Sequence, residues 1–205
     1  MIYLFSGTPG SGKSLHLAQL IYDTLRYKRL PVIANFDINP ATKGYKSRFW
    51  HVPNGELSPS FLYDFARDYW RGKNVREDSI LLAIDEAQLL FNSRSWNEVT
   101  AGASRMDWIE FFSQHRHFGY KVVFIAQNDR MIDRQIRSLI ELEENHRRMS
   151  NFGMVGKLLA LPFAGKLFAS VRMYYGLRER VGMTWLLPKR RYFRLYDSYN
   201  RFEQA

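Results

Sequence analysis

The sequence predicts an α/β protein whose central sheet is mostly parallel and flanked by helices. Short apolar runs alternate with segments of helical periodicity, a glycine-rich motif follows the first run, and a later run ends in two acidic residues. The chain has 205 residues, of which 46% are apolar and 24% are charged. This length and composition fit one globular domain and exclude a disordered or low-complexity protein.

The N-terminal part begins with a predicted strand and a predicted helix. Ile2–Ser6 is a short apolar run followed by Gly and Pro residues, and a helix is expected over residues 13–28. The apolar residues of this helix recur at three- and four-residue spacing. Pro31–Phe36 predicts a second strand. Residues 37–55 are rich in Asn, Pro, Gly and Lys and predict an irregular excursion.

Two later apolar runs predict strands that are buried on both faces. These runs are Ile80–Ile84 and Val122–Ala126. Helices are expected over residues 58–70, with Ser58 as the N-cap, and over residues 106–117. Buried strands separated by helices imply right-handed crossovers and therefore a parallel sheet.

The C-terminal part differs in charge and composition. We expect residues 1–144 to form the core and residues 145–205 a small, basic, aromatic-rich extension of the same domain. The extension holds 12 Lys/Arg and 3 Asp/Glu, a net charge of +9 out of +10 for the chain. Such asymmetry indicates an anionic partner, either nucleic acid or a membrane surface, although a solvated basic face is the alternative. Three β-prone segments suggest that the extension is β-rich: Val171–Tyr175, Thr184–Leu187 and Tyr192–Tyr196.

Several classes of protein are excluded by what the sequence lacks. Without cysteine there is no disulfide framework, thiol nucleophile or cysteine-ligated metal site. The N-terminus does not have the pattern of a secretory signal. The apolar stretch Met154–Val171 is interrupted by Lys157, Pro162 and Lys166, so it does not predict a membrane-spanning helix. The chain as given is expected to be soluble.

The most specific motif is a Walker A sequence directly after the first strand. It runs Gly7, Thr8, Pro9, Gly10, Ser11, Gly12, Lys13, Ser14 and is followed by Leu15 at the start of the predicted helix. Glycines let backbone N–H groups converge on phosphate oxygens, and the helix N-terminus adds partial positive charge. Lys13 is expected to reach the β- and γ-phosphates of a nucleotide, and Ser14 to ligate Mg²⁺.

A Walker B sequence ends the apolar run Ile80–Ile84. Asp85 is expected to hold the Mg²⁺ shell, and Glu86 to accept a proton from the attacking water or to orient it. Both motifs would then lie at adjacent strand ends of one parallel sheet. An exposed acidic pair at a strand end is the alternative for this motif taken alone.

Further candidates follow the second buried strand and lie near other element ends. Gln127, and after it Asn128, is expected to contact the γ-phosphate or its water, with loop capping as the alternative. An arginine from a neighbouring subunit can stabilise transition-state charge in ring ATPases. Arg116 and then Arg130 are the favoured candidates, and Arg105 and Arg134 are the others.

Three other functions are disfavoured: metal binding, GTP hydrolysis and phosphate transfer to a metabolite. His115 and His117 flank Arg116 but have no third metal ligand in the sequence, and they fit surface or capping positions better. The sequence Asn128–Met131 is not the guanine-specifying motif of a GTPase. Glu86 after Asp85 favours activation of water over phosphate transfer to a metabolite.

Taken together, the chain resembles the zonular occludens toxin (Zot) family, the assembly ATPases of filamentous phages. The resemblance rests on MIYLFSGTPGSGKS, on LLAIDEAQ, on Ser113–Gly119 with the following VVFIAQN, and on Leu195–Tyr199. It spans essentially the whole chain. The last two segments discriminate better than the Walker A motif, which many families share.

The resemblance implies an additional-strand ATPase that binds ATP and Mg²⁺ and assembles as a ring, expected to be a hexamer. In the family, hydrolysis powers extrusion of phage DNA and coat through the host inner membrane, so a location at the inner face of that membrane is implied. Many members continue into a transmembrane helix, so a missing anchor or a separate membrane partner is expected. Phage single-stranded DNA, coat protein and anionic lipid are the possible partners. A DNA-binding or packaging protein that uses ATP as a switch is the alternative function, and a membrane-docking domain with a vestigial site is a third.

Overall fold

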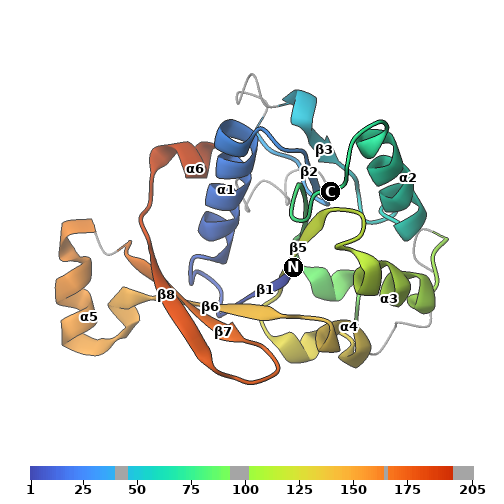
Figure 1. Ribbon diagram of the computed structural model, residues 1–205. Helices are drawn as coiled ribbons and strands as arrows, with labels where there is room; N and C mark the ends of the chain where they lie inside the picture. Colours follow the sequence, from blue (N-terminus) through green and yellow to red (C-terminus); the bar gives the residue numbers. More distant parts are fainter. Residues whose placement is uncertain (40–45, 93–101, 164–165, 196–205) are drawn as a thin grey trace.

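The structure is a computed structural model that describes residues 1–39, 46–92, 102–163 and 166–195 (Figure 1). One eight-stranded sheet has the order β3-β2-β4-β5-β1-β6-β7-β8. The strands are β1 (Ile2–Ser6), β2 (Val32–Ala34), β3 (Phe49–His51), β4 (Ile80–Ile84), β5 (Tyr120–Ile125), β6 (Leu142–Arg148), β7 (Phe168–Tyr174) and β8 (Arg180–Leu186). From β3 to β6 the pairing is parallel, and β7 and β8 add as antiparallel strands. The predicted α/β class with a mostly parallel sheet is confirmed.

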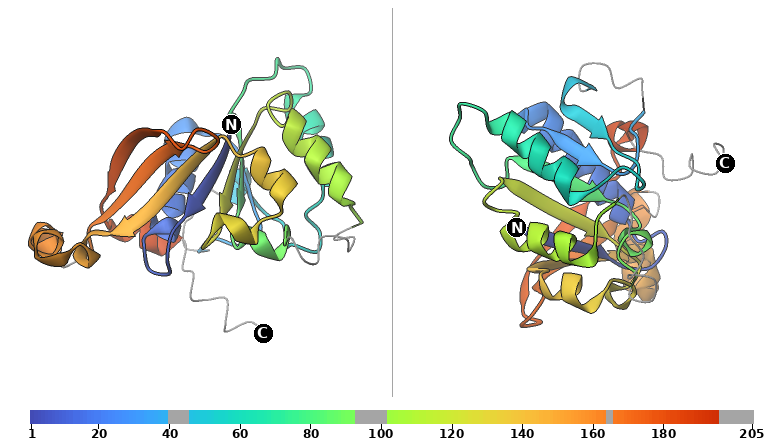
Figure 2. Two further views of the ribbon diagram at one scale, coloured as in Figure 1. Left: turned by 90° about the horizontal axis from the view of Figure 1, so that it is seen from below. Right: turned by 90° about the vertical axis from the view of Figure 1, so that its right-hand side faces the viewer.

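Helices cover both faces of the parallel strands (Figure 1). They are α1 (Lys13–Asp23), α2 (Pro59–Trp70), α3 (Arg105–Gln114), α4 (Arg134–Ser138), α5 (Gly153–Ala160) and α6 (Arg190–Leu195). One core cluster joins α2, α3 and α4 to the sheet, and a second joins α1 and α6 to its other face. The result is a three-layered core, from which α5 projects at the end next to β8 (Figure 2).

Local sequence signals set the helix boundaries. The Ser58 hydroxyl accepts a hydrogen bond from the Phe61 N–H at 3.3 Å and caps α2, whose first residue is Pro59. The Ser104 hydroxyl and the Asp107 carboxylate form a capping box that begins α3. The predicted helix over residues 13–28 is α-helical to Asp23 and continues as a π-helical turn over Thr24–Lys28.

Two expectations about individual elements were wrong. Strand β3 lies inside the region expected to be irregular, where it pairs with β2 at the sheet edge. The segment beginning at Tyr192, expected to be β-prone, forms helix α6, because Tyr192 and Leu195 pack against α1 as a helical pair. Tyr196 and the Tyr-Asp-Ser-Tyr segment lie outside the described residues.

The expected adjacency of the two Walker strands was also wrong. Strand β5 pairs with β4 on one side and with β1 on the other, so it separates the strand before Asp85 from the strand before Gly7. This additional strand places Gln127 between the two motifs. Strand β6, which the sequence did not predict, pairs with β1 on the side opposite β5. It runs from Leu142 to Arg148 and therefore spans the expected boundary between core and extension at residue 144. In the part of the chain that is described, no helix is long and apolar enough to cross a membrane.

Candidate nucleotide-binding site

The Walker A loop connects β1 to α1 through three glycines with left-handed backbone conformations. Gly7, Gly10 and Gly12 have φ values of 136°, 71° and 102°. The Ser11 N–H donates to the Thr8 carbonyl at 3.2 Å, which closes the loop. Positive φ values favour glycine and turn successive N–H groups towards one side, as an anion-binding nest requires.

Two of these glycines also lie against the edge of the sheet. A Cβ atom added to Gly7 would lie 2.5 Å from the His146 carbonyl oxygen, and one added to Gly12 would lie 2.9 Å from the Phe168 ring. The loop is therefore held closely by β6 and β7. Beneath it, the buried Ser11 hydroxyl has no hydrogen-bond partner among the described residues, so an oxygen-rich ligand would satisfy it.

Lys13 is the cationic group of the loop and is half-buried. Its ammonium donates to the carbonyl oxygens of Gly7 at 2.6 Å and Thr8 at 3.2 Å. Burial lowers the pKa of Lys13, and the nearby carboxylates of Glu86 and Asp85 oppose that shift. This electrostatic coupling links Lys13 to both acidic residues that follow β4.

Asp85 is positioned by a side chain from the neighbouring strand. Asn35, which follows β2, donates through Nδ2 to the Asp85 carbonyl and accepts the Asp85 N–H at Oδ1, each at 2.8 Å. Asn54 in turn accepts from Asn35 at 2.8 Å. The Asp85 carboxylate is buried and accepts the N–H of Glu86 at 2.9 Å.

Glu86 adopts a left-handed conformation with φ of 50° and ψ of 49°. Such a conformation costs free energy in a residue with a Cβ atom and marks a sharp change of direction after β4. The Glu86 carboxylate accepts a hydrogen bond from the Gln88 amide. The two acidic residues differ in exposure, since Asp85 is buried and Glu86 is half-buried.

Gln127 and Asn128 lie where β5 ends, between the two Walker motifs. The Gln127 carbonyl accepts the Gly7 N–H at 3.4 Å, which ties the end of β5 to the phosphate-binding loop. The Gln127 side chain is exposed. Asn128 accepts the Arg130 N–H at 2.9 Å and so caps the 3-10 turn Asp129–Met131. Asn128 thus has a capping role, and both residues line the pocket beside the Walker A loop.

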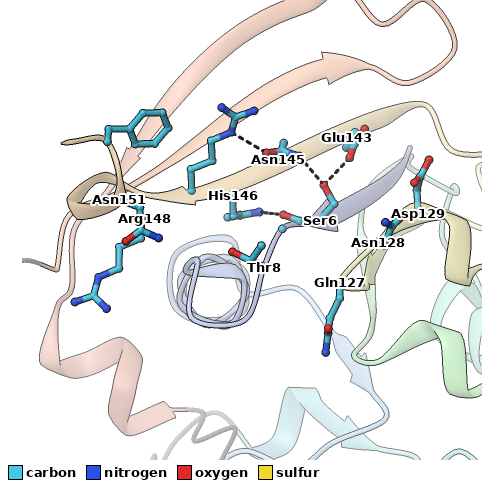
Figure 3. A pocket seen from close by; sticks show the side chains of 13 residues that line it. Ser6, Thr8, Gln127, Asn128, Asp129, Glu143, Asn145, His146, Arg148 and Asn151 are labelled. Carbon is cyan, nitrogen blue, oxygen red and sulfur yellow. Dashed lines mark hydrogen bonds between the residues drawn. The ribbon is translucent and has the colours of Figure 1, made fainter. Parts of the chain in front are cut away.

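A polar pocket of about 460 Å³ adjoins the loop at the ends of β1, β5 and β6 (Figure 3). Its lining combines loop residues, amides and basic side chains: Ser6, Gly7, Thr8, Gln127, Asn128, Asp129, Glu143, Asn145, His146, Arg147, Arg148, Asn151 and Phe152. Figure 3 shows Thr8 and Gln127 on one side and Arg148 with Asn151 on the other. The pocket offers hydrogen-bonding groups and cations beside the phosphate-binding loop.

Two adjacent histidines lie beside the loop, and of these His146 is buried and His16 is half-buried. His146 Nδ1 lies 3.2 Å from the Ser6 carbonyl, and its Nε2 lies 2.8 Å from His16 Nδ1. A carbonyl oxygen only accepts, so His146 carries its proton on Nδ1 and accepts from His16. Burial lowers the pKa of His16 to about 4 and of His146 to about 3, so both rings are neutral near pH 7. Phe5 stacks on His16 with ring centroids 4.5 Å apart.

The structure brings some of the predicted arginines near the site and not others. Arg130 is exposed on the turn after β5, at the loop edge of the sheet. Arg116 pairs with Glu141, which also accepts the Ile2 N–H at 3.0 Å. Arg116 therefore lies near the start of β1, at the end of the sheet opposite the Walker A loop. Arg105 pairs with Asp133 at 3.1 Å, and Arg134 begins α4. An arginine contribution from a neighbouring subunit stays a prediction.

The two histidines beside Arg116 have different environments. His115 is buried and its Nδ1 lies 2.6 Å from the Phe112 carbonyl, which places it as a cap at the end of α3. His117 is exposed. Among the described residues no group of three or more His, Cys, Asp or Glu side chains has the arrangement of a metal site.

Sequence reasoning missed the supporting residues of the site. Asn35 could have been predicted, because it is a polar residue directly after an apolar strand. The same pattern led to the prediction of Gln127. Glu143 had none: it is buried and accepts from the Ser6 hydroxyl at 2.5 Å, a contact across 137 residues. His146 likewise belongs to a strand of sequence LEENHRR, which has no apolar pattern.

Known proteins resemble this chain in sequence and in fold. The family model for zonular occludens toxin (Zot) matches residues 1–201. The Gene 1 protein of Enterobacteria phage fd is 30% identical over 186 residues, which cover 83% of this chain and 47% of that protein. The Gene 1 protein of Salmonella phage IKe is 32% identical over 175 residues, covering 81% and 46%. The chain therefore spans about half the length of these curated relatives.

Solved structures with the same fold include a member of the matched family. The N-terminal domain of zonular occludens toxin from Neisseria meningitidis has a TM-score of 0.59 at 18% identity, with 96% of this chain and 98% of that chain covered. The genome packaging NTPase B204 from Sulfolobus turreted icosahedral virus 2, in complex with ATP-gammaS, has a TM-score of 0.56 at 14% identity, with 92% and 97% covered. At these identities the likeness concerns the fold. Because the family model covers nearly the whole sequence, the chain belongs to the zonular occludens toxin (Zot) family, and it has the fold of a P-loop NTPase.

Proposed function

We propose that this chain is an ATP-hydrolysing motor domain that powers filamentous phage assembly and export across the host inner membrane. The observation that carries the proposal is the convergence of Lys13, Asp85 and Glu86 at one edge of the sheet. Membership of the Zot family and similarity to Gene 1 proteins of phages support the biological setting.

The phosphate chain of ATP would lie in the Walker A nest at the N-terminus of α1. Lys13 would exchange its two carbonyl partners for phosphate oxygens, which offer a stronger, charge-assisted hydrogen bond. The Ser14 hydroxyl and the Asp85 carboxylate are hard oxygen donors and fit Mg²⁺, which would neutralise charge on the phosphates. The hydrogen bonds from Asn35 would keep Asp85 in place during this step.

Glu86 would act as the general base. Its carboxylate lies directly after Asp85 and near enough to Lys13 to influence the pKa of that side chain. It would accept a proton from the water that attacks the γ-phosphate, and Gln127 would orient the same water from the end of β5. Positioning and electrostatic stabilisation would supply most of the rate acceleration.

A matched set of variants tests this assignment. Glu86→Gln should bind ATP with unchanged affinity and hydrolyse it roughly 10²-fold more slowly, because the base is lost and the shape is kept. Lys13→Ala should lose ATP binding itself. Glu110→Gln, the same change at an exposed position on α3, is the control and should leave both unchanged. Normal turnover in Glu86→Gln would remove Glu86 from the mechanism.

A second candidate is a DNA-binding or packaging protein in which ATP serves as a switch. The net charge of +9 in residues 145–205 favours it. Trp185 and Phe193 are exposed and could stack on bases, whereas Tyr192 is buried against α1. This reading expects single-stranded DNA affinity to fall steeply as salt rises, since phosphate contacts release counterions. Absent or salt-insensitive DNA binding would count against it.

Ring assembly and a position at the inner face of the inner membrane complete the proposal. Both parts of the proposal rest on membership of the Zot family. The chain spans only about half the length of its curated relatives, so the rest of such a protein could carry the membrane anchor. The load, whether phage DNA or coat protein, would be identified by its effect on ATP turnover.

A further inference from the structure

Helix α5 presents an apolar surface that nothing in the described chain covers. Met154 and Leu158 on the helix and Leu161 in the turn directly after it recur at helical spacing and are 87%, 68% and 67% exposed. On the inner side of the helix, Ala160 is buried, and a Cβ atom added to Gly156 would lie 2.1 Å from the Met149 carbonyl oxygen. Among the side chains that the structure describes, the helix therefore packs on the protein through small residues and exposes Met154 and Leu158.

The surroundings of α5 are basic. Lys157 is exposed beside this apolar row, and the segments that flank the helix carry the exposed side chains of Arg147, Arg148 and Lys166. An apolar row bordered by positive charge fits a partner surface that is apolar and bordered by negative charge. A large exposed apolar row of this kind indicates an interaction site.

An apolar surface whose lining includes two carboxylates exists on the same chain, along α2. A groove of about 380 Å³ has four aromatic residues and two carboxylates in its lining: Trp50, Phe61, Asp64, Phe65, Asp68 and Tyr69. Phe61, Phe65 and Tyr69 recur every four residues along α2, and Trp50 packs edge-on to Phe65 with ring centroids 4.9 Å apart. The groove is thus a preformed aromatic surface.

The carboxylates of the groove are available to a partner. Asp64 pairs with Arg67 at 2.7 Å and Asp68 with Arg71 at 3.0 Å, and all four side chains are at least 60% exposed. Exposed pairs of this kind contribute about 0–1 kcal/mol, so they can exchange partners at low cost. Neither arginine lines the groove.

The two surfaces lie at opposite ends of the molecule. Helix α5 projects beyond the β8 end, and α2 covers the sheet near the β3 edge; Figures 1 and 2 agree on this separation. The helix of one chain therefore cannot reach the groove of the same chain. A contact between α5 of one copy and the α2 groove of the next is head-to-tail, and repetition of such a contact gives a ring when the rotation closes.

We propose that α5 of one copy of this chain docks into the α2 groove of a second copy, and that this contact builds the motor assembly. The proposal deepens the proposed function, because ring formation is part of it. It also brings a neighbouring subunit close to the nucleotide, since Asn151 and Phe152, which directly precede α5, line the pocket beside the Walker A loop.

The test measures assembly by sedimentation velocity over a range of concentrations with Mg²⁺-ATP. Leu158→Glu should weaken association about tenfold or more, because it places a charge in an apolar contact. Asp64→Lys with Asp68→Lys should do the same from the groove side. Leu177→Glu is the matched control: Leu177 is 70% exposed and follows β7, away from both surfaces. These positions are exposed, so thermal unfolding should be unchanged.

A mixture of the two defective chains gives the sharpest result. The Leu158→Glu chain keeps its groove and the Asp64→Lys/Asp68→Lys chain keeps its helix, so an equimolar mixture should form dimers and nothing larger. A chain that combines Lys157→Glu with Asp64→Lys and Asp68→Lys has a negative charge on α5 and positive charges in the α2 groove. The two surfaces are then complementary again, so this chain should assemble with itself. Failure of the mixture to dimerise, or unchanged assembly of Leu158→Glu, would overturn the proposal.

Two further results separate this proposal from other readings. Wild-type chain that stays monomeric at every concentration also overturns it. If such a monomer binds vesicles containing anionic phosphatidylglycerol and Leu158→Glu abolishes that binding, α5 is a membrane-docking helix instead. ATP turnover that depends on Lys13 is measured in the same samples, so a failed interface with intact turnover leaves the proposed ATPase standing.

Discussion

At the residue scale, the geometry of the candidate site depends on Asn35, an asparagine that belongs to neither Walker motif. Asn35 makes both hydrogen bonds that hold the Asp85 backbone, and Asp85 itself is buried. The amide thereby fixes the direction in which the chain leaves β4, and with it the positions of both acidic side chains.

We expect Asn35→Ala to lower the ATP turnover rate about tenfold and the free energy of unfolding by about 1–3 kcal/mol, since two buried backbone groups lose their partners. Steady-state kinetics and denaturant unfolding measure the two effects. Asn54→Ala is the control, because Asn54 contacts Asn35 and has no hydrogen bond to Asp85 in the described structure. Equal effects of the two substitutions would contradict the role given to Asn35.

The adjacent histidine pair makes stability depend on pH. His16 and His146 have folded-state pKa values of about 4 and about 3, below the ordinary value of about 6.5 for an unfolded histidine. Between pH 6.5 and those values the unfolded chain binds protons that the folded chain does not. Stability should therefore fall as the pH drops below about 6.5, by up to about 1.4 kcal/mol per pH unit for each ring.

Unfolding by denaturant at pH 7.5, 6.5 and 5.5 measures this slope. His146→Asn keeps a donor for the Ser6 carbonyl and removes a titrating ring, so its slope should be smaller than that of the wild type. His117→Gln, at an exposed position, should keep the wild-type slope. An identical slope in all three chains would contradict the presence of two neutral histidines beside the loop.

At the element scale, the strands with a local signal were predictable and those without one were not. Strand β4 is a continuous apolar run, and strands β1 and β5 each contain one, Ile2–Phe5 and Val122–Ile125; the burial of these strands follows from that pattern. Strand β6 reads LEENHRR, yet Glu143 and Glu144 are buried. Their partners come from β1, β7 and the β7–β8 turn, so no local pattern could predict the strand.

The pair between β6 and β7 gives a prediction for this polar strand. Arg172 donates from Nε to the buried Glu144 carboxylate at 2.6 Å, and the Ser170 hydroxyl donates to the other oxygen. Arg172→Met should lower the free energy of unfolding by about 2 kcal/mol, since it leaves a buried carboxylate without its cation while Arg172 itself is partly exposed.

Denaturant unfolding of the single and double variants checks this expectation. The double variant Arg172→Met/Glu144→Leu should recover most of the loss, because no buried charge remains. Arg180→Met, on the exposed strand β8, is the control and should be nearly neutral. A double variant less stable than Arg172→Met would show that Glu144 stabilises β6 by itself.

At the scale of the whole molecule, the site was predictable because the Walker motifs carry their own structural context. The order of the strands was not predictable, since the sequences of Ile80–Ile84 and Val122–Ala126 do not indicate which of the two strands lies beside β1. Long-range pairing decides that order, and it places β5 between the motifs with Gln127 at its end. The same topology leaves α5 and the α2 groove at opposite ends of the molecule.

The most direct test of the central claim is Mg²⁺-dependent ATP hydrolysis, measured per subunit over a range of concentrations with Lys13→Ala as the control. A motor whose sites are completed by neighbouring copies should show turnover that requires Lys13 and rises per subunit as the chains associate. Single-stranded DNA added to the same assay would reveal part of the load. If no Lys13-dependent ATP hydrolysis is detected at any concentration, the proposed motor function is contradicted.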